Sequence, residues 1–198
     1  MKTKRHCDDK CCVDSGLEVT KKLVSVTSDF PTIGSPITLV YRIMLNNTSC
    51  KTIRCLDLQD SLYNQALFTT LGMTITAEAI SCNSLTILTS DEILANGGHV
   101  LNVCSSFVKK CSVCTLQLTV NVANPGQLHL LDNVAIVEGK VKDGVYYNKR
   151  GKCRKKLVKI EPIVACSGRY TNILSFLELI VNGGGTAEAV SALASVLE

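Results

Sequence analysis

Apolar and polar residues alternate with a period of two along several segments of this chain. Successive side chains of a β-strand point to opposite faces of a sheet, so this pattern predicts strands with one buried face. The pattern is clearest in segments 36–45 and 116–122. The predicted inward positions are Ile37, Leu39, Tyr41, Ile43 and Leu45 in the first segment, and Leu116, Leu118, Val120 and Val122 in the second.

Shorter segments of the same kind follow, separated by turn signals. Leu56 and Leu58 share a face, with Ile53 less regular, and Val134 and Ile136 mark another strand that could include Val141. Gly, Pro and Asn cluster at 30–36, 46–47, 96–98 and 124–126, where turns are expected. Seven or more short strands at this spacing predict an all-β chain folded as a β-sandwich. The hydrophobic fraction of 46% is sufficient for its core.

The chain divides into four parts by composition. We expect an N-terminal arm over 1–16, the sandwich over 17–140, a basic β-hairpin and strand over 141–166, and an apolar tail over 167–198. Asp143-Gly144 predicts a hairpin turn, and 155–164 predicts a strand that stops near Pro162. In the tail, 173–181 fits a short helix or a strand, and Thr186 can cap a helix over 186–197. The tail could dock on its own body or on a neighbouring subunit.

The body also carries motifs in a familiar order. They are LEVTK at 17–21, IGS at 33–35 with ITLVYRI at 37–43 and NN at 46–47, LDLQDSL at 56–62, and finally LANGG at 94–98, LQLTVNV at 116–122 and NVAIV at 133–137. This arrangement resembles the conserved surface-repeat domain (domain of unknown function eleven) of bacterial and archaeal cell-surface proteins. The resemblance implies an immunoglobulin-like sandwich over 17–140. It supplies a scaffold and no catalytic residues. The chain departs from the family in its cysteine content and in Tyr63, where a proline is usual.

Eleven cysteines are the most unusual part of the composition. In oxidising surroundings an odd number leaves at least one thiol for an intermolecular bond or leaves it free. Three lie in the polar arm, namely Cys7, Cys11 and Cys12. A polar terminal segment cannot bury three thiols, and a disulfide between adjacent cysteines is strained. We therefore expect the arm cysteines to reach outward and form intersubunit disulfides. Their arrangement resembles the N-terminal connectors of bacterial endospore appendage subunits. Intrachain stapling, metal binding and unpaired thiols are the alternatives.

The body cysteines are candidates for acceptors of the arm or for intrachain disulfides. They are Cys50, Cys55, Cys104, Cys111, Cys114, Cys153 and Cys166. Cys111-x-x-Cys114 could be a redox motif, but that interpretation requires a βαβ context. It could also form a zinc site with Cys50 and Cys55. Disulfides are the favoured interpretation, and we expect no metal and no cofactor.

No pattern of polar residues indicates an enzyme. His6, His99 and His129 lack the neighbours of a nucleophilic triad, and Asp57 and Asp60 are expected to cap a turn. The basic run 149–156 is expected to be a solvated hairpin face rather than a nucleic-acid site, since the net charge of +4 is too small to imply a polyanionic partner.

These features predict a non-enzymatic structural subunit that self-assembles into a disulfide-cross-linked extracellular fibre or surface layer. The expected partners are copies of itself, with other coat or appendage proteins possible, and neither nucleic acid nor membrane. The polar segment 1–14 lacks the apolar region of a secretory signal, which favours a spore-type surface assembled after cell lysis. Two alternatives are a binding module, such as an adhesin or virion decoration, and a cytosolic zinc-stabilised protein.

Overall fold

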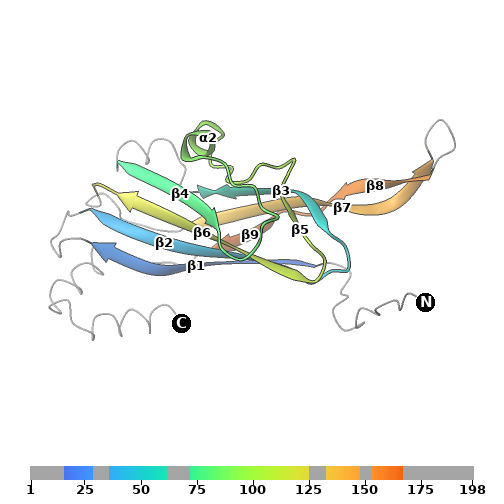
Figure 1. Cartoon of the computed structure of the whole chain (residues 1–198), viewed down its shortest axis with the longest axis horizontal. Helices are drawn as coiled ribbons and strands as arrows, with labels where there is room; N and C mark the ends of the chain where they lie inside the picture. Colours follow the sequence, from blue (N-terminus) through green and yellow to red (C-terminus); the bar gives the residue numbers. More distant parts are fainter. Residues whose placement is uncertain (1–15, 29–35, 62–71, 125–132, 148–152, 167–198) are drawn as a thin grey trace.

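Two antiparallel sheets pack face to face as a sandwich, with one short helix among the described residues (Figure 1). The computed structural model describes residues 16–28, 36–61, 72–124, 133–147 and 153–166. The first sheet has the order β1 (Leu17–Ser28), β2 (Ile37–Asn47), β6 (Ser112–Val122) and β4 (Met73–Ala79). The second has the order β5 (Phe107–Val108), β3 (Ile53–Asp60), β7 (Val134–Tyr147) and β8 (Cys153–Lys159), with β9 (Ile163–Cys166) also paired to β7. The predicted β-sandwich is therefore confirmed at the level of two packed antiparallel sheets.

The core lies between the two sheets and follows the predicted alternation. All nine inward positions predicted on β2 and β6 are buried, with exposed fractions of 2% or less. These two strands pair with each other along their whole length, from Ile37 opposite Val122 to Asn47 opposite Ser112. The predictions for these two strands are confirmed.

Strand β3 is less regular because it contains a β-bulge. Its register against β7 shifts between Arg54 and Asp57, and Cys55 adopts a φ of 50°. The extra residue lets both Ile53 and Leu56 face the core, with Leu58 following on the same side. This explains why Ile53 does not fit the alternation that Leu56 and Leu58 follow.

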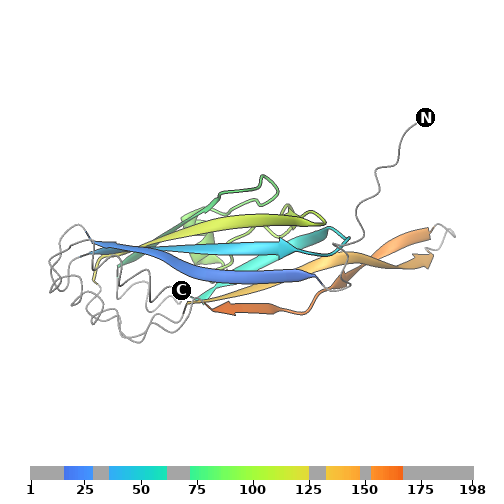
Figure 2. The same cartoon turned by 90° about the horizontal axis from the view of Figure 1, so that it is seen from below.

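Strand β7 differs from the sequence prediction in two ways. Its buried side chains are Ala135 and Val137, whereas Ile136 is 37% exposed, so the strand presents the opposite face to the one expected. The dipeptide at Asp143 lies inside β7 rather than in a hairpin turn, at a shift in its register against β8. The paired ends of β7 and β8 continue past the rest of the sandwich (Figures 1 and 2).

The segment expected to be one strand over 155–164 is divided between β8 and β9. Pro162 lies between the two strands, and a proline cannot donate to the ladder. The arm 1–15 and the tail 167–198 lie outside the described residues, so the predictions for the arm cysteines and for a tail helix stay predictions.

A short helix, α2 (Ser90–Ala95), was not predicted. Thr89 and Glu92 form a reciprocal capping box at its start, and these hydrogen bonds hold the pKa of Glu92 below its ordinary value. Gly97 and Gly98 follow with φ of 69° and 91°, in the expected turn. None of the helices in the described ranges is long and apolar enough to cross a membrane.

Candidate functional site

One disulfide ties the first sheet together at one end. Cys82 follows β4, Cys114 lies in β6, and their sulfurs are bonded with the Cα atoms 5.4 Å apart. The main chain brings the two segments together, because the amide of Ile80 donates to the carbonyl of Thr115 at 2.8 Å. Cys82 was not among the sequence-predicted candidates. Predicting it would require knowing that β4 pairs with β6, and the sequence does not show that pairing.

A third cysteine, Cys50, is also disulfide-bonded. It lies where the arm joins the sandwich, because the amide of Thr48 donates to the carbonyl of Gly16 at 2.7 Å. Gly16 approaches closely enough that a Cβ there would lie 2.6 Å from the backbone nitrogen of Ser49. Cys111 is at the same place, since its amide donates to the carbonyl of Ser49 at 3.1 Å. The structure therefore gathers two predicted acceptor positions at the end from which the arm departs.

Three other body cysteines are thiols that form no disulfide. Cys104 and Cys166 are exposed, and Cys55 is half-buried at the β3 bulge. Cys104 lies in a turn whose Asn102 side chain accepts a hydrogen bond from the Cys104 amide at 3.2 Å. Cys166 ends β9 and is opposite Val134. Cys153 begins β8, and its side chain lies outside the described part of the structure.

The zinc alternative is not supported at the residues proposed for it. Cys114 cannot be a thiolate ligand while it is bonded to Cys82. Across the described ranges, no three His, Cys, Asp or Glu side chains are grouped so as to hold a metal ion.

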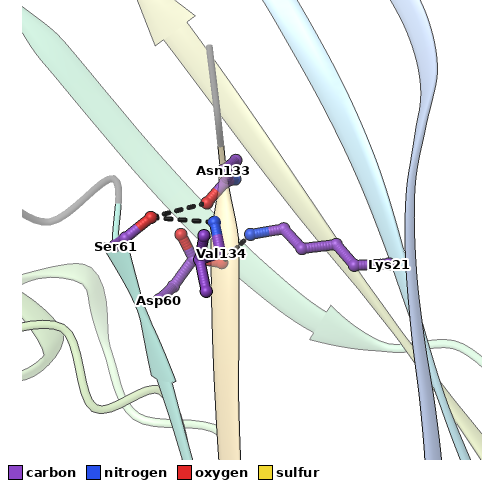
Figure 3. Close-up of polar contacts among 5 residues, drawn as sticks. All are labelled: Lys21, Asp60, Ser61, Asn133 and Val134. Carbon is purple, nitrogen blue, oxygen red and sulfur yellow. Dashed lines mark hydrogen bonds and ion pairs between the residues drawn. The ribbon is translucent and has the colours of Figure 1, made fainter. Parts of the chain in front are cut away.

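A buried ion pair lies in the core between the two sheets. Lys21 of β1 and Asp60 of β3 reach towards each other from opposite sheets, with 2.5 Å between Nζ and Oδ2 (Figure 3). Both side chains are 0% exposed. Asp60 was expected to cap a turn, but it follows Leu56 and Leu58 on the inward face of β3 instead. Its predicted companion, Asp57, is near the surface, where its carboxylate lies 2.8 Å from Nδ1 of His99.

The surroundings of Lys21 disfavour its charge. Burial lowers the pKa of the Lys21 ammonium, and the attraction of Asp60 opposes that shift only in part. The ring of Tyr41 lies 5.2 Å from Nζ and offers a weak cation–π contact. Removing a charged pair from water costs several kcal/mol per ion, so such a pair is weak evidence for stability by itself.

A third buried polar side chain completes the cluster, at the start of β7. Asn133 is 0% exposed, and its Oδ1 accepts a hydrogen bond from the hydroxyl of Ser61 at 3.4 Å. The same hydroxyl accepts from the amide of Val134 at 2.8 Å (Figure 3). The Nδ2 of Asn133 has no hydrogen-bond partner among the described residues.

Sequence reasoning missed Lys21 and Asn133 as site residues. The available signal was a break in the alternation, because Lys21 occupies the same face of β1 as the buried Leu23. We name the buried group of Lys21, Asp60 and Asn133 the core triad.

No family model matches the chain, and no curated protein is similar to it. The two-sheet fold is consistent with a β-sandwich, and the resemblance of 17–140 to the surface-repeat domain stays a prediction from its short motifs.

Proposed function

We propose that this protein is a structural subunit that self-assembles into a disulfide-cross-linked extracellular fibre or surface layer, of the kind found in spore appendages and coats. The observation that carries the proposal is the state of the body cysteines. Cys104 and Cys166 are exposed thiols on a rigid sandwich, and neither forms a disulfide. Free exposed thiols in oxidising surroundings are expected to bond to another molecule.

The body in this proposal is an immunoglobulin-like module that serves as a rigid unit of the assembly. The outer face of its second sheet supports a lateral contact between copies. Ile136 and Val164 are directly opposite each other on β7 and β9, with exposed fractions of 37% and 59%. A cross-strand apolar pair on a solvent-facing surface loses its unfavourable hydration when a neighbour covers it.

The arm in this proposal supplies the thiols that reach a neighbour. Cys7, Cys11 and Cys12 precede Gly16, where the chain joins the sandwich. Since Cys50 is already disulfide-bonded, the acceptors we propose are Cys104 and Cys166. An arm that bonds to a different site on the next copy makes a head-to-tail contact, and such contacts give open filaments when they do not close into a ring.

The test is oxidative assembly of the full chain, followed by electrophoresis in SDS with and without reductant. We expect a ladder or a gel-excluded polymer that returns to the 21.4 kDa monomer on reduction. The pair of substitutions Cys104→Ser and Cys166→Ser should shorten the ladder, and Cys11→Ser with Cys12→Ser should do the same. Cys55→Ser is the matched control, because that thiol is half-buried and should leave the ladder unchanged. A wild-type chain that runs as a monomer after oxidation would rule out the cross-linking mechanism.

A further inference from the structure

Burying the charged and polar groups of the core triad costs desolvation free energy that packing alone does not require. Lys21 and Asp60 face inward from two strands and Asn133 lies immediately before a third, at positions where apolar residues would bury without desolvating charge. Lys21 has an apolar stem that could have placed its ammonium in water, as Lys22 does next to it, yet the lysine side chain is fully buried.

We propose that Lys21 and Asn133 become joined by an intramolecular amide bond, formed within the folded core with Asp60 as the acid–base group. The bond would link Nζ of Lys21 in the first sheet to Cγ of Asn133 in the second. This inference is independent of the proposed intersubunit disulfides, because it concerns a bond inside one sandwich.

The register of the second sheet places the acid beside the amide. Asp60 is directly opposite Ala135, so Asn133 is its diagonal neighbour on the same face of the sheet. Diagonal neighbours have Cβ atoms about 7–8 Å apart or somewhat less, within reach of polar side chains. Lys21 enters from the other sheet and its Nζ already contacts Asp60 (Figure 3). The strands therefore hold the amine, the acid and the amide in one water-poor region, which is the positioning that accelerates an intramolecular reaction.

The chemistry needs no cofactor or oxidant. In a low-dielectric core the pair Lys21 and Asp60 can exchange a proton and become a neutral amine and a carboxylic acid. The neutral amine is a nucleophile, and the lowered pKa of Lys21 increases its share. Nζ attacks Cγ of Asn133 while Asp60 protonates the carbonyl oxygen.

Collapse of this intermediate completes the exchange. Asp60 takes a proton from Nζ and delivers it to Nδ2, the bond from Cγ to Nδ2 breaks, and ammonia leaves with the remaining proton as ammonium. One carbon–nitrogen bond replaces another, so nothing is oxidised or reduced. The hydroxyl of Ser61 assists, because its hydrogen bond to Oδ1 polarises the carbonyl that is attacked.

Asn133 is a better acceptor than Asp60 for two reasons. Asp60 becomes a carboxylate whenever it gives up its proton, and a carboxylate resists attack by an amine. The carboxamide of Asn133 stays neutral, and its carbonyl already accepts a hydrogen bond. The Nδ2 that must leave is held by no hydrogen bond among the described residues. Departure of ammonia also makes the step effectively irreversible. An amide bond to Asp60 would instead release water, and the surrounding water would favour the reverse hydrolysis.

The test is the intact mass of the full chain after all disulfides are reduced, followed by mapping of its proteolytic peptides. We expect the wild-type chain to be lighter than its sequence by one ammonia molecule. A branched peptide should join the segment of Lys21 to that of Asn133. The branched peptide is decisive, because a succinimide at Asn96-Gly97 would lose the same mass without a branch.

Substitutions assign the roles. Lys21→Arg, Asp60→Asn and Asn133→Ala should each restore the full mass and abolish the branched peptide. Lys22→Arg is the matched control and should leave both unchanged, since Lys22 is exposed beside Lys21. If a core variant fails to fold, the wild-type mass and peptide map still decide the question. A wild-type chain of full mass would overturn the proposal, and loss of water with Lys21 joined to Asp60 would overturn the choice of acceptor.

Discussion

The disulfide between Cys82 and Cys114 should stabilise the sandwich chiefly by restricting the unfolded chain. The perturbation is the double substitution Cys82→Ala and Cys114→Ala, which avoids placing a hydroxyl at the buried Cys114 position. The two residues are 32 positions apart, and closing a loop of that length is worth about 4 kcal/mol by the chain-entropy relation.

That magnitude sets the expected shifts. With a urea slope of about 2 kcal/mol/M, a loss of about 4 kcal/mol lowers the midpoint of unfolding by roughly 2 M. For a chain of this size each kcal/mol shifts the melting temperature by about 2–4 °C, so a decrease of about 8–16 °C is expected. The slope itself should rise, because the unfolded chain of the variant is less constrained and exposes more surface.

Urea unfolding followed by circular dichroism measures both quantities on the same samples. Cys104→Ser is the control, since an exposed thiol outside any disulfide should change the free energy of unfolding by less than about 0.5 kcal/mol. Wild-type protein treated with reductant should be destabilised at least as much as the double variant, because reduction also opens the disulfide of Cys50. An unchanged midpoint and slope in the double variant would refute the reasoning, because the bond would then constrain nothing in the unfolded state.

Three further predictions concern the scaffold. Asn47→Ala should lower the free energy of unfolding in urea by about 2–4 kcal/mol, because the two N–H groups of the buried Nδ2 of Asn47 are shared among three backbone carbonyls. Asn46→Ala removes a partly exposed side chain and should cost less than half as much. Gly139→Ala should lower the urea midpoint by the equivalent of about 1–3 kcal/mol, because the added Cβ would lie 2.6 Å from Cγ2 of the buried Ile53, and a wild-type midpoint would contradict this contact. The capping box of α2 should weaken as the pH falls below 4.5, because the pKa of Glu92 is lowered in the folded state and the stabilisation from its carboxylate is lost on protonation. The hydrogen-exchange protection factors of the α2 amides should fall over the same pH range. Protection factors that do not change with pH would argue against the cap.

The central strands could be predicted from the sequence because their two faces differ in chemistry. In β2 and β6 the inward positions are apolar and most outward positions are polar, so period two identifies both the strand and its buried face. In β7 four consecutive apolar residues, 134–137, occupy both faces. Pairing with β3 decides which of them turn inward, and this long-range contact leaves no mark in the local pattern.

The candidate sites were harder to predict because they depend on contacts between distant segments. Cys82 meets Cys114 only through the register of β4 against β6. Lys21 is acceptable in the core only because Asp60 arrives from the other sheet, 39 positions away in the chain. From the sequence alone, Lys21 is a lysine that interrupts an apolar alternation, and its partner is an aspartate at the end of another strand.

The measurement that tests the proposed function most directly is disulfide mapping of an assembly made from equal amounts of normal and ¹⁵N-labelled chains. The two forms are reduced, mixed, oxidised together and digested without reductant. The proposal predicts mixed-isotope disulfide peptides that link the arm cysteines to Cys104 or Cys166, while Cys82 and Cys114 are joined only within one isotope form. Disulfide peptides without any isotopic mixing would mean that every bond closes inside its own chain, and would contradict a cross-linked assembly.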